Sequence, residues 1–269
     1  MILSTHGIIG SRVTVASGDA DALAFFTAAG ITDTTQKSAI NTLVTDLKTA
    51  NIWTKMKALY PFVGGTAASH RFNLKDPRTV DAAFYLDFLG GGTHSANGYQ
   101  PNGTTSYADT KLTPSLIYSN ISNISIGFYS RTNTQGTSND IGIYQNDTKA
   151  LGVQTRWTDN TLYAQCYKDG SPEGLVISNL NSSGFFQLTR TSTTSLKIFR
   201  NSSILGSSSS AMAGAIPTLP ICISNNGNNG SFSAREQALS FIADGLTDGE
   251  AVAFYIAVQS YNTTLNRQV

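Results

Sequence analysis

Apolar and polar residues alternate in short runs between about Ser69 and Ala243, and each run ends in a stretch rich in Gly, Asn, Ser or Thr. Ile124, Ile126 and Phe128, for instance, are separated by single residues that would face the other side of a strand. Period-two alternation is typical of half-buried β-strands, and many short strands between turn signals predict a β-sandwich or barrel. We therefore expect a mainly β fold built from antiparallel strands.

Helical patterns precede this region. Residues Asp19–Ala29 predict a short helix that ends at Gly30, and Thr32 is suited to cap a second helix. The apolar face then continues through residues 53–60, where we expect a further short helix. The second helix has its apolar residues three and four positions apart, at Ile40, Leu43, Val44 and Leu47.

The C-terminal region carries the clearest helix signal. Thr247 and Glu250 have the spacing of a capping box, in which the threonine hydroxyl accepts from the backbone and the glutamate reaches back to it. The sequence therefore predicts an amphipathic helix that begins after Thr247 and ends near Asn262. One side of this helix is formed by Val252, Tyr255, Ile256 and Gln259.

These patterns divide the chain into three parts. Residues 1–16 form an arm without helix signals, residues 17–66 a helical segment packed on the sandwich, and residues 67–269 the sandwich with its C-terminal helix. We expect the arm to dock onto a neighbouring chain. The apolar side chains available for that contact are Ile2, Leu3, Ile8 and Ile9.

The charge of the chain excludes some partners. Charged residues make up 13 % of the sequence and the net charge is +1, with lysines and arginines scattered along the chain. Without a basic stripe we expect no nucleic-acid partner. The longest apolar run, residues 251–258, is too short for a membrane span.

The cysteines and the N-terminus indicate in which cellular compartment the protein is made. Cys166 and Cys222 are the only cysteines and both lie in predicted strands, so we expect buried free thiols. The first residues lack the basic and apolar regions of a secretory signal. Both observations favour synthesis in the cytoplasm.

Catalytic chemistry finds little support. Glycosidases of this architecture need two carboxylates beside the scissile bond, often as alternating acids on one strand, and no such string occurs. Asp87 is a lone acid on a predicted strand. The only glutamates are Glu173, Glu236 and Glu250, in a turn, at a strand start and in a helix cap. We therefore predict no catalytic residues and no cofactor.

A metal site is also poorly supported. Calcium needs clustered oxygen ligands, and the candidates are the Asx pairs Asn139-Asp140, Asn146-Asp147 and Asp159-Asn160 beside predicted strands. Such pairs are more often turn formers. We therefore predict no metal, although an ion at a sandwich edge stays open.

One outward face is the best candidate for binding. If the apolar side chains of the central strands point inward, residues of opposite parity share the outer side of one sheet. Such a face suits an ordinary solvated surface, a subunit interface, or stacking and hydrogen bonding to sugars. Trp157 has core parity and is not assigned to it. The predicted face consists of Tyr129, Arg131, Tyr144, Gln154, Arg156, Tyr163, Gln165 and Tyr167.

Three segments resemble a known module. They are KMKALYPFVGGTAASHRFNLKDPR at 55–78, LGGGTHSANGYQPNGTTSYADT at 89–110 and LSFIADGLTDGEAVAFYIAVQSYNTTL at 239–265. Together they are similar to a recurrent module of bacteriophage virion proteins, related to concanavalin A-like lectin/glucanase (laminin-G-like) jelly rolls. The resemblance implies an antiparallel jelly-roll sandwich in a head-fibre, capsid-decorating or tail-associated protein. It also implies homo-oligomers, among which trimers are common for fibres.

Three functions follow from these observations. The first is a non-catalytic virion structural protein, exposed on the particle surface and joined to other virion proteins through the N-terminal arm. The alternative is a module that binds host-surface glycans or receptors through the tyrosine-rich face. The third is a polysaccharide-degrading enzyme, against which the missing paired acids argue.

Overall fold

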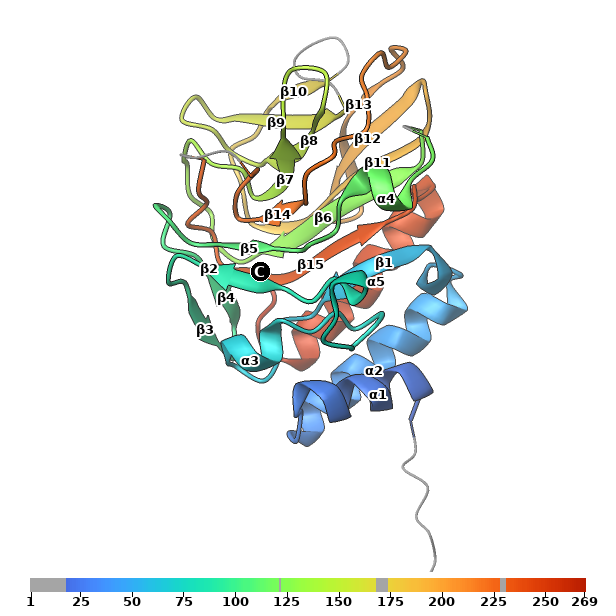
Figure 1. Cartoon of the computed structure of the whole chain (residues 1–269), viewed down its shortest axis with the longest axis vertical. Coiled ribbons are helices and arrows are strands. Elements are labelled where there is room, and N and C mark those ends of the chain that lie inside the picture. The colour runs from blue at the N-terminus through green and yellow to red at the C-terminus, as the bar shows by residue number, and fades with distance from the viewer. Residues whose placement is uncertain (1–17, 121, 168–173, 228–230) are drawn as a thin grey trace, which may run out of the picture.

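The computed structural model describes residues 18–120, 122–167, 174–227 and 231–269. Two antiparallel sheets pack face to face, which confirms the predicted sandwich (Figure 1). The eight-stranded sheet has the order β13-β12-β11-β6-β15-β4-β3, with β1 also paired to β15. Its strands are β1 (Met56–Tyr60), β3 (Thr93–Ser95), β4 (Gly98–Gln100), β6 (Ile124–Ser130), β11 (Gly184–Ser192), β12 (Ser195–Arg200), β13 (Ser203–Ser208) and β15 (Gln237–Ala243).

The seven-stranded sheet has the order β10-β9-β8-β7-β14-β5-β2. Its strands are β2 (Asp87–Leu89), β5 (Tyr107–Asp109), β7 (Ile141–Tyr144), β8 (Ala150–Gln154), β9 (Thr161–Cys166), β10 (Leu175–Ser178) and β14 (Cys222–Ile223). The helices are α1 (Ala20–Ala29), α2 (Thr34–Thr49), α3 (Ala67–His70), α4 (Pro114–Ile117) and α5 (Asp248–Thr264), with 3₁₀ turns at Trp53–Lys55 and Asp81–Ala83.

The molecule has two hydrophobic cores. Between the sheets, Ile126 and Phe128 of β6 belong to the same buried cluster as Ile143 of β7 and Val153 of β8. A second core lies on the outer side of the eight-stranded sheet, where α1, α2 and α5 cover it (Figure 1). Each core is supplied by alternate residues of the same strands, as period-two patterning requires.

Aromatic rings hold the second core together. The ring centroid of Phe254 on α5 lies 4.7 Å from that of Phe241 on β15 and 5.1 Å from that of Phe185 on β11, both in edge-to-face contact. Such contacts stabilise beyond the area that they bury. The helices are therefore part of the folded body and not an appendage beside it.

The cap signals fix the helix ends. Gly30 adopts a left-handed conformation (φ 66°) after α1, and the Thr247–Glu250 capping box begins α5, both as expected. The cap of α2 is Asp33 and not Thr32, since Asp33 Oδ1 accepts from the Gln36 backbone N–H at 2.8 Å.

The helix expected over residues 53–60 is wrong. Only Trp53–Lys55 forms a 3₁₀ turn, and Met56–Tyr60 is strand β1, paired antiparallel with β15. Its side chains alternate between the cores, Leu59 toward the helices and Ala58 and Tyr60 toward the sandwich interior. A segment of five residues, four of them apolar, is too short for periodicity to distinguish a helix from a strand, and pairing with a distant strand decided it.

The buried side of α5 also differs from the prediction. Ala251, Phe254, Val258 and Tyr261 are buried, whereas Ile256 is 61 % exposed. Apolar residues occur around most of this helix, so its sequence does not single out one face. The predicted stripe of Val252, Tyr255, Ile256 and Gln259 is the more exposed side.

The remaining predictions concern the cysteines, membrane spans, the N-terminal arm and the division at residue 66. Cys166 and Cys222 are free and buried, as predicted. Within the described residues, no helix combines the length and apolar character needed to cross a membrane. The arm of residues 1–16 lies outside the described residues, and the division at residue 66 stays a prediction, although β1 joins the sheet from before that boundary.

Candidate functional site

Tyr129 does not belong to an outward binding face. It lies on β6, in the eight-stranded sheet, and is fully buried. Its hydroxyl donates to Gln259 Oε1 at 3.0 Å and accepts from the Val269 N–H at 2.8 Å. The parity prediction was right that Tyr129 points away from the sandwich interior, but helix α5 covers that side.

Tyr167 is also buried, contrary to expectation. It follows the end of β9 and has a positive φ of 71°, which breaks the alternation that would have turned it outward. The side chain joins the core between the sheets, where its hydroxyl has no hydrogen-bond partner among the described residues. A positive φ at a non-glycine residue cannot be read from alternation, so the strand pattern alone predicts the wrong side for Tyr167.

The other predicted residues do not share one sheet. Arg131 follows β6, and its guanidinium pairs with Glu236 and donates to the Arg267 carbonyl oxygen. Tyr144 on β7 donates to Asp147, and Gln165 lies half-buried on β9. The face predicted as one surface is therefore divided between the two sheets.

Three predicted residues do come together. Gln154 on β8 and Tyr163 on β9 are direct cross-strand partners on the outer side of the seven-stranded sheet. Arg156 follows Gln154 with the same parity, at the start of the turn that joins the two strands. All three are half-buried. They form one polar edge at the end of this hairpin.

The turn between β8 and β9 adds an aromatic pair. It is closed by backbone bonds from Trp157 N–H to the Thr161 oxygen (2.7 Å) and from Asn160 N–H to the Trp157 oxygen (3.0 Å). The ring of Trp157 packs edge-to-face on that of Tyr163, with 6.1 Å between centroids. The core position expected for Trp157 is wrong, because the turn begins before it and places it half-buried beside Tyr163.

Amide side chains hold Arg156. Its Nε donates to Asn160 Oδ1 at 2.9 Å and its Nη1 to Asn133 Oδ1 at 3.0 Å. Gln135 Nε2 donates to the same Asn160 oxygen at 2.6 Å. Loop 131–139 and the β8–β9 turn are thereby joined, and the guanidinium is fixed by neutral groups.

A pocket of about 190 Å³ lies beside this cluster. Its walls carry hydroxyl, amide and aromatic side chains. Gln135 links it to Arg156 through Asn160. The pocket is lined by Gly103, Thr134, Gln135, Gly136, Thr137, Ser138, Phe232, Ala234 and Arg235.

The base of the pocket is a buried ion pair. Arg235 Nη1 lies 2.9 Å from Asp140 Oδ1, and the two side chains are 1 % and 0 % exposed. Arg235 Nη2 also donates to the carbonyl oxygens of Thr134 (2.8 Å) and Arg156 (2.7 Å). Each buried charge is thus compensated, as burial requires. The pair fixes the pocket loop and the β8–β9 turn to one another.

We call this arrangement the end site. It consists of the pocket together with Asn133, Gln154, Arg156, Trp157, Asn160 and Tyr163. Sequence reasoning found Gln154, Arg156 and Tyr163 and missed the rest. The polar run at 131–139 and the Asp159-Asn160 pair were available as signals, but turn residues do not reveal which loops meet in space.

The Asx pairs do not form a calcium site. Asp140 Oδ1 accepts from Arg235 and Ser233, and its Oδ2 accepts from the backbone and hydroxyl of Thr155. Asn146 and Asp159 each accept from the backbone two residues later, as turn formers do. Among the described residues, no group of three or more His, Cys, Asp or Glu side chains is placed to hold a metal.

Two carboxylates lie opposite one another elsewhere. Asp87 on β2 and Asp109 on β5 are cross-strand partners. Burial and the neighbouring Asp87 raise the pKa of the Asp109 carboxyl. Lys111 Nζ lies 3.0 Å from carboxylate oxygens of both Asp87 and Asp81, so one member of the pair is neutralised. Sequence reasoning treated Asp87 as lone because the strand pairing was not visible.

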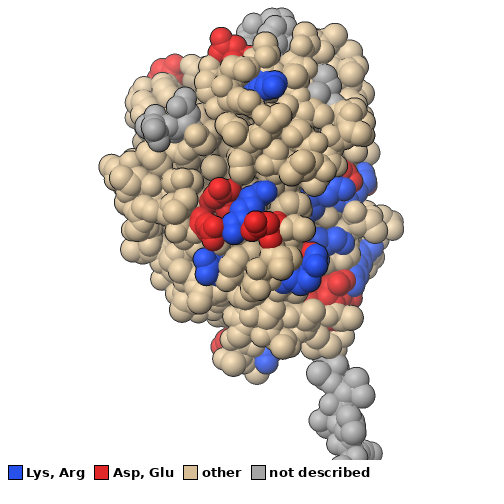
Figure 2. All heavy atoms as spheres, viewed as in Figure 1, with Lys and Arg blue, Asp and Glu red and all other residues tan. Residues whose placement is uncertain are grey.

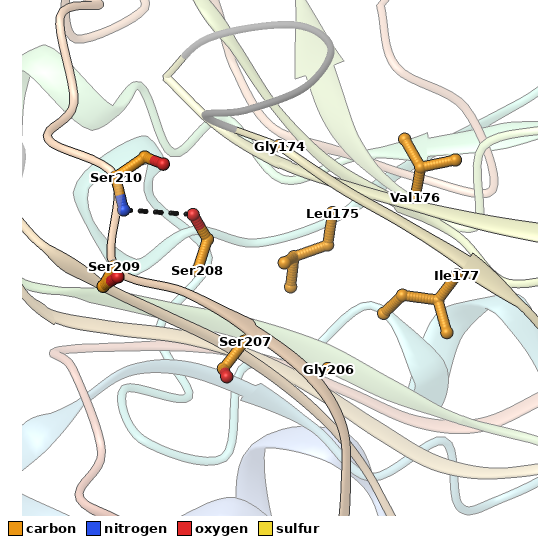
Figure 3. A pocket seen from close by; sticks show the side chains of 9 residues that line it. All are labelled: Gly174, Leu175, Val176, Ile177, Gly206, Ser207, Ser208, Ser209 and Ser210. Carbon is orange, nitrogen blue, oxygen red and sulfur yellow. Dashed lines mark hydrogen bonds between the residues drawn. The ribbon is translucent and has the colours of Figure 1, made fainter.

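Another cavity, of about 430 Å³, lies between the edge strands β10 and β13 (Figure 3). Leu175, Val176 and Ile177 form one side and serines 207–210 the other. Among the described residues, it is lined by no charged or aromatic side chain. Figure 2 shows that neutral residues also dominate the molecular surface in this view. The end site, in contrast, brings charged, amide and aromatic groups together.

No protein family and no curated protein matches the sequence. Among solved structures, the chain is similar to botulinum neurotoxin type C, with a TM-score of 0.50 and 12 % identity over 78 % of this chain and 53 % of the toxin chain. Cell entry of that toxin depends on interaction with two ganglioside molecules. This likeness shows the β-sandwich fold.

Two further structures have lower scores. Domain 4 of AbnA, an extracellular GH43 arabinanase from Geobacillus stearothermophilus solved with arabinotriose, has a TM-score of 0.48 and 13 % identity over 74 % of this chain and 98 % of that domain. The binding domain of Paraclostridial Mosquitocidal Protein 1 has a TM-score of 0.48 and 13 % identity over 78 % of this chain and 53 % of its own. This chain therefore spans about half of each toxin chain.

Proposed function

We propose that the chain is a non-catalytic carbohydrate-binding β-sandwich that contacts saccharides through the end site. The observation that carries this proposal is the junction of the Arg156–Asn160–Gln135 cluster with the Tyr163–Trp157 ring pair. Sugar hydroxyls need donors and acceptors held in place, and sugar C–H faces need apolar rings. A few fixed polar groups beside aromatic surface are typical of small-molecule sites.

Preorganisation supports the same function. The loop that carries Gln135 is held by the buried Arg235, and Arg156 is held by two amide oxygens. Groups that are already ordered lose little conformational freedom when a ligand binds, which favours affinity. The sandwich fold shared with the ganglioside-dependent toxin is consistent with a binding role, but the argument rests on the site itself.

Substitution of Tyr163 tests this function. A glycan array followed by calorimetry should show binding by the unmodified protein and at least a tenfold loss for Tyr163→Ala, since stacked aromatic residues dominate such contacts. Tyr144→Ala is the matched control, because Tyr144 is a half-buried tyrosine on the same sheet outside the end site. Absence of binding to every glycan, or equal losses in both variants, contradicts the proposal.

We further propose that the chain does not cleave the saccharide. Asp87 and Asp109 are cross-strand partners among the described residues and could be compared with the acid pair of a glycosidase. Lys111, however, neutralises Asp87. They also belong to other strands than the end site. Incubation with bound glycans should yield neither reducing ends nor unsaturated products, and product formation that is lost in Asp109→Asn would refute this.

A role in a bacteriophage virion is a second proposal. The three segments that resemble virion modules meet in space. Strand β15 pairs with β1, and the Tyr261 hydroxyl donates to the Pro61 oxygen at 2.7 Å. His94 Nδ1 lies 2.9 Å from His70 Nδ1. The resembling segments thus form one structural unit. We propose a fibre or decoration subunit on the particle surface that assembles with other virion proteins and with copies of itself.

Removal of the N-terminal arm tests the virion role. Deletion of residues 2–12, which lie outside the described residues, should leave the sandwich folded and block incorporation into particles. Imaging of particles with the protein labelled would show its position on the head or tail. Normal incorporation of the shortened protein would contradict the docking role of the arm.

A further inference from the structure

Three arginines near the end site differ in how their charge is balanced. Arg131 pairs with Glu236, and Arg235 pairs with Asp140. Arg156 is bonded to loop 131–139 through Asn133, and its carbonyl oxygen accepts from Arg235. In the described part of the chain, no carboxylate oxygen lies within 4.0 Å of its guanidinium nitrogens.

The guanidinium of Arg156 is oriented but not saturated. Of its five N–H groups, Nε–H donates to Asn160 and one Nη1–H donates to Asn133. Within the described residues, the Nη2 amino group has no recorded partner. Asn133 is itself held by the Ser182 backbone N–H at 3.0 Å. The free edge of the fork therefore has a fixed direction.

A fixed arginine fork with a free edge matches one ligand chemistry best. Two parallel N–H groups suit the two oxygens of a carboxylate, which bind such a fork with charge-assisted hydrogen bonds. A neutral sugar hydroxyl would use one of these donors and leave the charge unbalanced. Because amides and not carboxylates fix Arg156, the site keeps a full positive charge for the ligand.

The charged groups around the fork do not cancel this preference. Arg235 is buried and neutralised by Asp140. Asp159, on the same turn, accepts from the Thr161 N–H at 2.9 Å and from the Tyr163 hydroxyl at 3.4 Å. Its carboxylate is thus engaged by the turn and by Tyr163, and does not pair with Arg156.

We infer that the end site selects acidic saccharides, with Arg156 binding the carboxylate of a uronic-acid or sialic-acid unit while Tyr163 and Trp157 contact the ring of a sugar. This inference rests on the proposed carbohydrate-binding function and names its ligand class. The selecting group is the side chain of Arg156, whose backbone carbonyl separately anchors Arg235.

Matched glycans test the inference. An array carries uronic-acid and sialic-acid saccharides beside the same saccharides with each carboxylate reduced to a primary alcohol, and beside sulfated neutral saccharides. The unmodified protein should bind acidic members at least tenfold more tightly than their reduced partners. This preference should shrink as sodium chloride rises, because the pair is partly exposed.

Variants assign the preference to one residue. Arg156→Gln keeps a hydrogen-bond donor but loses the charged fork, so it should lose the tenfold preference for acidic over reduced saccharides. Arg156→Lys should retain part of it. Arg78→Gln is the control, because Arg78 is an exposed arginine paired with Asp76 outside the end site. Equal thermal midpoints of all variants would show that the fold is kept.

The outcomes separate the two proposals. Binding of neutral saccharides that depends on Tyr163 but shows no acid preference overturns the acidic-ligand inference alone. A preference that survives in Arg156→Gln overturns the assignment to Arg156, and equal binding of sulfated saccharides overturns the assignment to a carboxylate. Absence of binding to any saccharide overturns the carbohydrate function and the inference with it.

Discussion

The two sheets have similar inner faces and very different outer faces. The outer face of the eight-stranded sheet is covered by α1, α2 and α5 and contributes to a second hydrophobic core (Figure 1). The outer face of the seven-stranded sheet carries half-buried polar residues at Gln154, Tyr163 and Gln165. One outer face therefore stabilises the fold, and the other presents the groups of the end site.

Two tyrosines show what this difference teaches. Tyr129 and Tyr163 have the same relation to the strand pattern, since both alternate with residues that point into the sandwich. Tyr129 is fully buried under α5, whereas Tyr163 stays half-buried beside Trp157. Alternation therefore identifies the side of a sheet, but an element far away in the sequence decides whether that side meets water.

The largest expected effect concerns the covered face. Phe254→Ala should lower the free energy of unfolding by about 4 kcal/mol, because it leaves a cavity between α5 and the rings of Phe185 and Phe241. Ile256→Ala, on the exposed side of the same helix, should change it by less than about 0.5 kcal/mol. Urea unfolding followed by circular dichroism measures both, and equal losses would show that α5 does not seal the sheet.

The buried ion pair beneath the end site gives the next effect. Asp140→Asn should cost about 3 kcal/mol, since Arg235 would remain buried without a compensating charge. Arg78→Gln removes an exposed ion pair with Asp76 and should cost under about 1 kcal/mol. Thermal unfolding would reveal the difference. A small loss of stability in Asp140→Asn would mean that water reaches the ion pair and that the pair does not hold the end site rigid.

Acid should destabilise the folded protein, because the His70 imidazole is buried without charge. Burial, with the nearby His94 and Arg267, lowers the pKa of the His70 imidazole to about 3. The unfolded chain binds a proton near the ordinary value of about 6.5 and the folded chain does not, so stability is full above that pH and falls below it. Between pH 7 and pH 5 we expect a loss of about 2 kcal/mol from His70 alone.

Urea midpoints at pH 7, 6 and 5 test this expectation. His70 Nδ1 lies 2.9 Å from His94 Nδ1, so one nitrogen donates and the other accepts while both rings are neutral. Burial also lowers the pKa of His94. His70→Phe should flatten the pH dependence, and an unchanged slope in that variant would assign the effect to other groups.

The smallest effect concerns the cap of the covering helix. Thr247→Ala should cost about 1 kcal/mol, because the Thr247 hydroxyl accepts from the Glu250 N–H and begins α5. Thr113→Ala is a matched control, since Thr113 precedes α4 without a side-chain cap bond. The Thr113 variant should differ from the unmodified protein by less than about 0.5 kcal/mol. Similar losses in both variants would contradict the capping contribution.

Sequence patterns correctly predicted the helix caps and strands that depend on residues close to one another in the sequence. The caps of α1 and α5 and the strands around Ile126, Ile143 and Val153 follow from spacing alone, because the turn residues and alternation that form them lie close in sequence. Strand β1 was not predicted, since five mostly apolar residues fit either a helix or a strand. Pairing with β15, far along the chain, made the choice.

Only some residues of the end site could be predicted from the sequence. Gln154 and Tyr163 share an edge because β8 and β9 are consecutive strands joined by a short turn. Gln135 and Asn133 were missed, since their approach to Arg156 depends on how distant loops meet. Trp157 was misplaced because alternation was extended beyond the end of β8 at Gln154 into the turn.

The amino-acid sequence by itself determined a sandwich of short strands, the helix caps, two buried thiols and a sparsely charged surface, because each depends on composition or on neighbours within a few residues. Tertiary structure alone decided which outer face is covered, why Tyr129 is buried while Tyr163 is half-buried, and that Arg156 has no carboxylate partner among the described residues. These outcomes depend on contacts between residues about a hundred positions apart, such as Tyr129 with Gln259 and Arg235 with Asp140, which no local pattern encodes.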